Sequence, residues 1–114
     1  MVEQEFDLSI TPIGNPVQIH LNKGDSDFQL IFNIDSRSGD FTMENYTTAR
    51  ICGTKPDGSK YQATASISVS DKRVTVNGDR NMTDVPGVGL FEICLIHGGK
   101  ELYTQNFKMY IENV

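Results

Sequence analysis

The feature that most constrains this chain is the alternation of apolar and polar residues between Phe28 and Ile111, which turn residues interrupt at regular intervals. Successive side chains of a strand point to opposite faces, so a two-residue period predicts half-buried strands with one apolar face. The apolar positions form four runs: Phe28, Leu30, Phe32 and Ile34; Ala63, Ala65, Ile67 and Val69; Phe91, Ile93 and Leu95; and Phe107, Met109 and Ile111. The sequence therefore predicts an all-β domain.

The turn residues divide the chain into seven or eight short strands. The expected strands cover residues 6–10, 17–21, 27–34, 46–54, 61–70, 74–76, 87–96 and 101–112, and polar loops are expected over residues 36–45 and 79–86. Pro56, Asp57 and Gly58 form a turn signal, as do Asn77 and Gly78. Many short strands with turns every eight to twelve residues are typical of a β-sandwich, and a small barrel is the second choice.

Length and charge limit the classes of function. With 114 residues, 38% of them hydrophobic, the chain is expected to form a single domain over 1–114. A net charge of −5 argues against nucleic acid, because cationic contacts to phosphate dominate that affinity. The acidic start and the lack of a long apolar stretch predict neither a signal peptide nor membrane insertion. The expected site of synthesis is therefore the cytoplasm, and Cys52 and Cys94 are expected as free thiols rather than a bridge.

Residue types used in catalysis and metal binding do not form a recognisable set. His20 and His97 have no cysteine at a metal-ligand spacing, and Asp25 is interpreted as a turn residue before a strand. No nucleophile has an identifiable base partner. We therefore expect no catalytic residue, no metal site and no cofactor.

Four tyrosines are the remaining candidates for a functional surface. Tyr46, Tyr61, Tyr103 and Tyr110 would suit a protein interface or stacking on sugar rings if they lie on an outer sheet face. The alternative is that they border the core with hydrated hydroxyl groups. Tyr110 is the best candidate for exposure, because the apolar residues beside it take the opposite face.

The order of several segments also resembles a known family. An apolar strand introduced by Gly24-Asp25 leads to the turn Lys55-Pro56-Asp57-Gly58. Pro86-Gly87 then opens Val88-Gly89-Leu90-Phe91-Glu92-Ile93, and the last hairpin ends in Leu102-Tyr103-Thr104-Gln105-Asn106-Phe107. Over residues 17–113 this resembles the N-terminal domain family of upper baseplate proteins from tailed phages of Gram-positive bacteria.

The resemblance implies an immunoglobulin-like β-sandwich of mostly antiparallel strands and a structural role without catalysis. The expected function is a component of a phage or prophage tail baseplate, which docks onto other tail subunits as a homo-oligomer and helps attach the receptor-binding machinery. Its expected location is the virion, after assembly in the host cytoplasm. The family pattern continues into a longer protein, so a stand-alone tail component and a prophage remnant are both open.

The sequence leaves two other functions open and gives a prediction for residues 1–16. A carbohydrate-binding module and an extracellular bacterial immunoglobulin-like adhesin domain are also compatible with an all-β chain. Residues 1–16, set apart by two prolines, are expected either to form an arm donated to a neighbouring subunit or to pair within their own sheet.

Overall fold

The computed structural model describes residues 1–10, 16–35 and 46–113, so the predicted loop over 36–45 lies outside the described residues. The described part contains nine strands and one short helix. The elements are β1 (Val2–Ser9), β2 (Val17–Asn22), β3 (Phe28–Asp35), β4 (Thr48–Thr54), β5 (Lys60–Ser68), β6 (Arg73–Asn77), α1 (Arg80–Thr83), β7 (Gly87–His97), β8 (Lys100–Tyr103) and β9 (Phe107–Glu112). The prediction of an all-β domain is confirmed.

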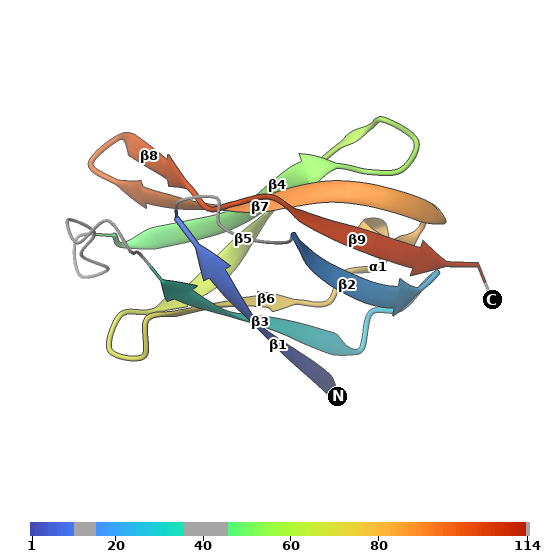
Figure 1. Ribbon diagram of the computed structural model, residues 1–114, viewed down its shortest axis with the longest axis horizontal. Coiled ribbons are helices and arrows are strands. Elements are labelled where there is room, and N and C mark those ends of the chain that lie inside the picture. Colours follow the sequence, from blue (N-terminus) through green and yellow to red (C-terminus); the bar gives the residue numbers. More distant parts are fainter. Residues whose placement is uncertain (11–15, 36–45, 114) are drawn as a thin grey trace.

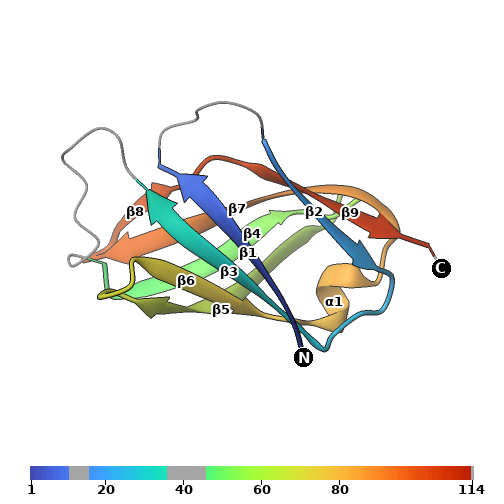
Figure 2. The same ribbon diagram turned by 60° about the horizontal axis from the view of Figure 1, so that its bottom comes forward.

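The strands follow one continuous path in the order β1-β3-β6-β5-β4-β7-β9-β2, and β8 pairs with β7 beside this path. The path folds over on itself, so that β1, β3 and β6 lie opposite β2, β9 and β7 (Figures 1 and 2). Its two end pairs, β1 with β3 and β2 with β9, are parallel, and the other pairs are antiparallel. This mixed, nearly barrel-shaped arrangement does not by itself establish the immunoglobulin-like topology.

The N-terminal segment takes part in its own sheet. β1 pairs with β3 along its whole length, from Val2 opposite Phe28 to Ser9 opposite Asp35. Residues 2–9 therefore pair within their own sheet, which is one of the two arrangements expected for residues 1–16. Donation of this strand to a neighbour in an assembly stays a prediction.

The last predicted strand is divided in two. β8 and β9 both pair with the same side of β7, and residues 104–106 between them belong to neither strand. The buried Thr104 still donates its backbone N–H to the Ile93 carbonyl at 2.9 Å, but its side-chain hydroxyl, not its carbonyl, accepts a hydrogen bond of 3.1 Å from the Ile93 N–H. A side chain therefore takes the place of one backbone acceptor where the strand is interrupted.

The predicted polar loop over residues 79–86 contains the helix α1. The Asp79 side chain caps this helix by accepting a hydrogen bond of 3.1 Å from the backbone N–H of Asn81. Met82 and Thr83 are buried. A helix of four residues is too short to produce a helical period in the sequence, so the prediction of a loop was wrong at this point.

A row of aromatic rings crosses the core. Phe6 packs on Phe32 with 5.9 Å between ring centroids, and Phe32 packs on Phe107 at 4.9 Å. Phe107 lies 6.3 Å from Phe91, which meets the ring of Tyr61 edge-on at 6.2 Å. The row connects β1 and β3 on one side of the molecule with β9, β7 and β5 on the other.

Two glycines make room for the Phe91 ring. A Cβ atom at Gly53 would lie 2.7 Å from Phe91 Cδ1 and 2.3 Å from the Leu90 carbonyl oxygen. At Gly89 it would lie 2.6 Å from Phe91 Cε2. Since real Cβ contacts do not come this close, the ring can lie here only because both positions lack a side chain.

This packing predicts a large loss of stability for Gly53→Ala. We expect the free energy of unfolding to fall by about 3 kcal/mol, because the added methyl group overpacks the core against backbone atoms that cannot move aside. The control is Gly58→Ala, at a turn glycine with φ +89° and open space around it, where backbone strain alone should cost about 1 kcal/mol. Urea unfolding measures both, and equal losses would contradict the packing argument.

Candidate docking surface

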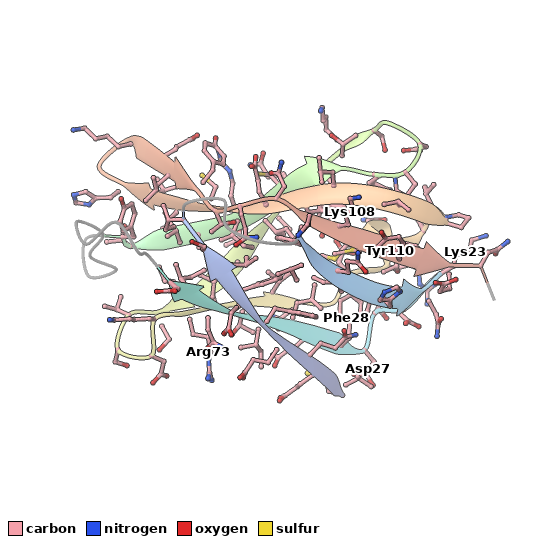
Figure 3. All side chains as sticks on the ribbon, in the orientation of Figure 1. Lys23, Asp27, Phe28, Arg73, Lys108 and Tyr110 are labelled. Carbon is pink, nitrogen blue, oxygen red and sulfur yellow. The ribbon has the colours of Figure 1, made fainter. Side chains whose placement is uncertain are left out.

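The outer face of β2, β9 and β7 carries neighbouring aromatic and apolar side chains. In one row of the sheet His20 is opposite Tyr110, which is opposite Val88; in the next row Lys108 is opposite Leu90. The His20 and Tyr110 rings stack at 4.9 Å with an angle of 11° between their planes. We call these five residues the docking face, and Figure 3 shows Lys108 and Tyr110 on β9.

Val88 and Leu90 are unusual because they are apolar residues on the solvent side of a strand. They are 51% and 46% exposed, and Gly89 and Phe91 occupy the buried positions that follow each of them. The glycine keeps the strand close to the Phe91 ring on the core side, which leaves the larger apolar residues outside. Exposed apolar groups that cluster with aromatic rings are typical of interaction sites.

A charged network lies on the outer face of β4 and β8. Arg50 Nη2 lies 2.9 Å from Glu101 Oε1, and the Tyr103 hydroxyl donates a hydrogen bond to the same carboxylate. These two donors hold the pKa of Glu101 below its ordinary value. In turn, the hydrogen bond to Glu101 raises the pKa of Tyr103 to about 12.

Both cysteines are free, as predicted. Cys94 is buried on β7, between Arg50 of β4 and Tyr103 of β8 in the sheet register, and Cys52 is partly exposed. Burial raises the pKa of each thiol. A raised pKa lowers the fraction of thiolate, which is the reactive form of a cysteine.

The four tyrosines occupy different environments. Tyr61 is buried, and its hydroxyl donates a hydrogen bond of 2.8 Å to Asp79 Oδ2. Tyr46 is half-buried and meets the His97 ring edge-on at 6.1 Å. Tyr103 is 40% exposed, and Tyr110 is half-buried on the docking face. The structure thus places Tyr61 in the core and leaves Tyr46, Tyr103 and Tyr110 at least partly accessible, and a role of the four tyrosines at an interface stays a prediction.

The other residues considered from the sequence have local roles. The Asp25 side chain accepts a hydrogen bond of 2.9 Å from the backbone N–H of Asn22, which confirms it as a turn residue. His97 is exposed at the end of β7. Among residues 1–10, 16–35 and 46–113, no group of three histidine, cysteine or acidic side chains is arranged to hold a metal ion. The described helix is far too short to cross a membrane.

Sequence reasoning did not single out Val88 and Leu90. The signal that could have found them is Gly87-Val88-Gly89-Leu90, where glycine alternates with an apolar residue just before the buried Phe91. Since Phe91 fixes the inward face of the strand, the two-residue period places Val88 and Leu90 outward.

Comparisons with known proteins identify the fold. The N-terminal domain of phage TP901-1 ORF48 superposes with a TM-score of 0.75 at 15% sequence identity, over 99% of this chain and 100% of that one. CopC from Methylosinus trichosporium OB3b gives a TM-score of 0.51 at 10% identity, over 86% and 89% of the two chains. No protein-family description and no curated protein sequence matches the chain. The resemblance to a phage N-terminal domain is therefore confirmed at the level of the fold.

The network on β8 predicts a tyrosine whose titration depends on a neighbouring carboxylate. We expect Glu101→Gln to lower the pKa of Tyr103 from about 12 towards the ordinary value of about 10. NMR of ¹³C-labelled tyrosine rings during a pH titration measures the change. Because the folded-state pKa is the higher one, the contribution of this hydrogen bond to stability is complete below about pH 10 and is lost as the pH rises through about 12.

The control for this titration is Glu92→Gln, which removes a carboxylate on the neighbouring strand β7. It should leave the Tyr103 titration in place. A Tyr103 pKa that Glu101→Gln does not change would contradict the assignment of the shift to the Glu101 hydrogen bond.

Proposed function

We propose that this protein is a non-enzymatic structural component of a phage or prophage tail baseplate, which docks onto other tail subunits and helps attach the receptor-binding machinery. The observation that carries the proposal is the fold match over the full length of a domain described as the N-terminal domain of a phage protein. The segment order found in the sequence independently resembles N-terminal domains of phage upper baseplate proteins. The proposal places the chain in the virion and does not depend on an immunoglobulin-like topology.

The docking face supplies a plausible contact with a tail subunit. Val88 and Leu90 provide exposed apolar area on its β7 side, and the stacked Tyr110 and His20 rings extend it across β9 and β2. Lys108 lies on β9 between Leu90 and Gln18, and its charge helps to select the orientation of a partner. A stable contact buries about 1,200–2,000 Å² in total, so the partner must cover neighbouring strands as well.

The same face supports the proposal of a homo-oligomer, since a baseplate is built from repeated subunits. Aromatic side chains such as tyrosine are enriched at protein interfaces, and the cores of homodimer interfaces are more apolar than the rest of the surface. The partners are accordingly other tail proteins or further copies of this chain, without nucleic acid or a membrane. No described feature favours the carbohydrate-binding or adhesin alternatives over this one.

The proposal predicts that Leu90→Glu removes the protein from assembled particles. An uncompensated charge buried in a desolvated contact costs enough to lower incorporation by about tenfold or more. The change is made in the phage genome or prophage that encodes the chain, and quantitative mass spectrometry of purified particles measures the copy number relative to a capsid protein.

The matched control is Val69→Glu, which places the same charge on an exposed apolar residue outside the docking face. This variant should enter particles at the normal level. Equal incorporation of the two variants would exclude the docking face, and absence of the unmodified protein from purified particles would overturn the baseplate proposal itself.

A further inference from the structure

The two ends of the strand path, β1 and β2, face each other without a backbone ladder between them (Figure 2). We call the interval between them the seam. Within the described residues, the Gln4 side chain crosses it and donates a hydrogen bond of 3.3 Å to the His20 carbonyl. At the far end of β1, Gln105 completes the closure, because its backbone N–H and side-chain oxygen bond to the carbonyl and N–H of Ser9 at 2.8 and 2.9 Å.

Within residues 1–10, 16–35 and 46–113, the backbone of β1 presents to the seam hydrogen-bonding groups that are not paired with another strand. The N–H groups of Val2 and Ile10 bond to Asp27 and Asp35 on the β3 side, so the even-numbered residues face β3. The N–H and C=O of a strand residue point to the same edge, and successive residues alternate between edges. The odd-numbered residues Glu3, Glu5 and Asp7 therefore direct their backbone groups away from β3, into the seam.

The backbone of β2 does the same from the other side. The N–H of Lys23 bonds to the Glu112 carbonyl at 2.8 Å, which assigns the odd-numbered residues to β9. The carbonyl of His20, which accepts from Gln4, accordingly faces the seam, and so do the backbone groups of Gln18. In the described part of the chain, two strand edges that share no backbone ladder therefore face each other.

The seam also contains space beside these edges. A groove of about 310 Å³ is lined by Val2 and Gln4 from β1, Phe28 from β3, His20 and Leu21 from β2, and Glu112 from β9. Neighbouring strands lie about 4.8 Å apart, so a strand added between β1 and β2 needs about twice that distance. A glutamine side chain spans the interval, but some Cα atoms of the two strands lie within 8 Å of each other, so the seam widens when it admits a strand. Figure 3 shows Phe28 at the start of β3 beside this opening. The groove has an apolar floor and two polar backbone edges.

The charges around the seam are mainly acidic. Glu3, Glu5 and Asp7 are exposed along β1, and Asp27 and Glu112 lie at the mouth of the groove. Their cationic neighbours are distant: Arg73 Nη2 lies 3.6 Å from Glu5, and the terminal ammonium lies 3.8 Å from Asp27. His20 Nδ1 lies 3.8 Å from Glu112, and the Asn33 side chain donates a hydrogen bond of 3.3 Å to Asp7. The field therefore favours a cationic occupant and opposes the acidic β1 strand of a second copy.

We propose that the seam accepts an extended, basic segment of a partner protein as an added β-strand. The segment pairs with the backbone of Glu3 and Glu5 on one edge and of Gln18 and His20 on the other, and it displaces the Gln4 amide. Its apolar side chains face the floor formed by Leu21 and Phe28, while its lysine or arginine side chains lie beside the β1 carboxylates. This inference deepens the proposed docking role and rests on it for the source of the segment.

The test uses a synthetic peptide of alternating valine and lysine, seven residues long and blocked at both ends, with the complete protein. We expect binding by calorimetry, and slower hydrogen exchange at the amides of Glu3, Glu5 and His20 by NMR. A valine–glutamate peptide should bind at least about tenfold more weakly, and so should a valine–lysine peptide with alternate backbone amides methylated. The methylated peptide keeps the charges but loses half of the ladder.

Two protein variants separate backbone pairing from charge. Glu5→Pro removes an N–H that faces the seam and leaves the ladder to β3 intact, so it should weaken binding of the peptide about tenfold. Glu5→Gln keeps that N–H and removes only the charge, so its effect should be smaller and should vanish at high salt. Circular dichroism verifies the fold, and the methylated peptide provides the same test if the proline variant does not fold.

Three results would overturn the proposal. The first is a valine–lysine peptide that fails to bind at millimolar concentration, the second is binding that slows hydrogen exchange only in strands other than β1 and β2, and the third is a methylated peptide that binds as tightly as the unmethylated one. Slower exchange that grows with protein concentration without peptide would identify a second copy as the occupant instead. Any of these leaves the particle-incorporation experiment on Leu90 unaffected, so failure of the seam and failure of the proposed function are distinguishable.

Discussion

The packing of aromatic rings across the core joins strands from both sides of the molecule and fixes how they are oriented. Phe32 and Phe107 are in contact at the centre, and the row continues through Phe91 to Tyr61. These rings come from strands on opposite sides of the molecule, so their burial holds the folded-over strand path together. Aromatic pairs of this kind contribute about 0.5–1.5 kcal/mol each beyond the area that they bury. These rings also determine which face of each contributing strand points into the core.

The outer surface follows from this inward constraint. Because Phe91 must enter the core beside Gly53 and Gly89, the preceding residues of β7 present Val88 and Leu90 to solvent. The same logic applies on β9, where Phe107, Met109 and Ile111 are buried and Lys108 and Tyr110 face outward. The docking face is therefore a consequence of core packing, and rigid strands hold its side chains in place. Precise placement on a scaffold is what an assembly contact requires.

Much of the fold could be predicted from the sequence, because alternation reports directly which side chains are buried. The run from Phe28 to Ile34 is buried at every second residue as expected. Strand partners were not predictable, since the parallel pairs β1–β3 and β2–β9 join segments that no short turn connects. The helix α1 and the break at Thr104 depend on side-chain hydrogen bonds that leave no period. In the candidate site, the outward position of Tyr110 followed from alternation, whereas burial of Tyr61 depends on its distant partner Asp79.

We propose that this fold serves as a docking module at the end of a phage tail, and single-particle electron cryomicroscopy of purified particles from the encoding phage is the sharpest test of that role. Density for this domain, whose described residues form nine strands, is expected in the baseplate in several symmetry-related copies, with the outer face of β7 and β9 against another tail subunit. A tail tip reconstructed at side-chain resolution without the domain would rule out this role.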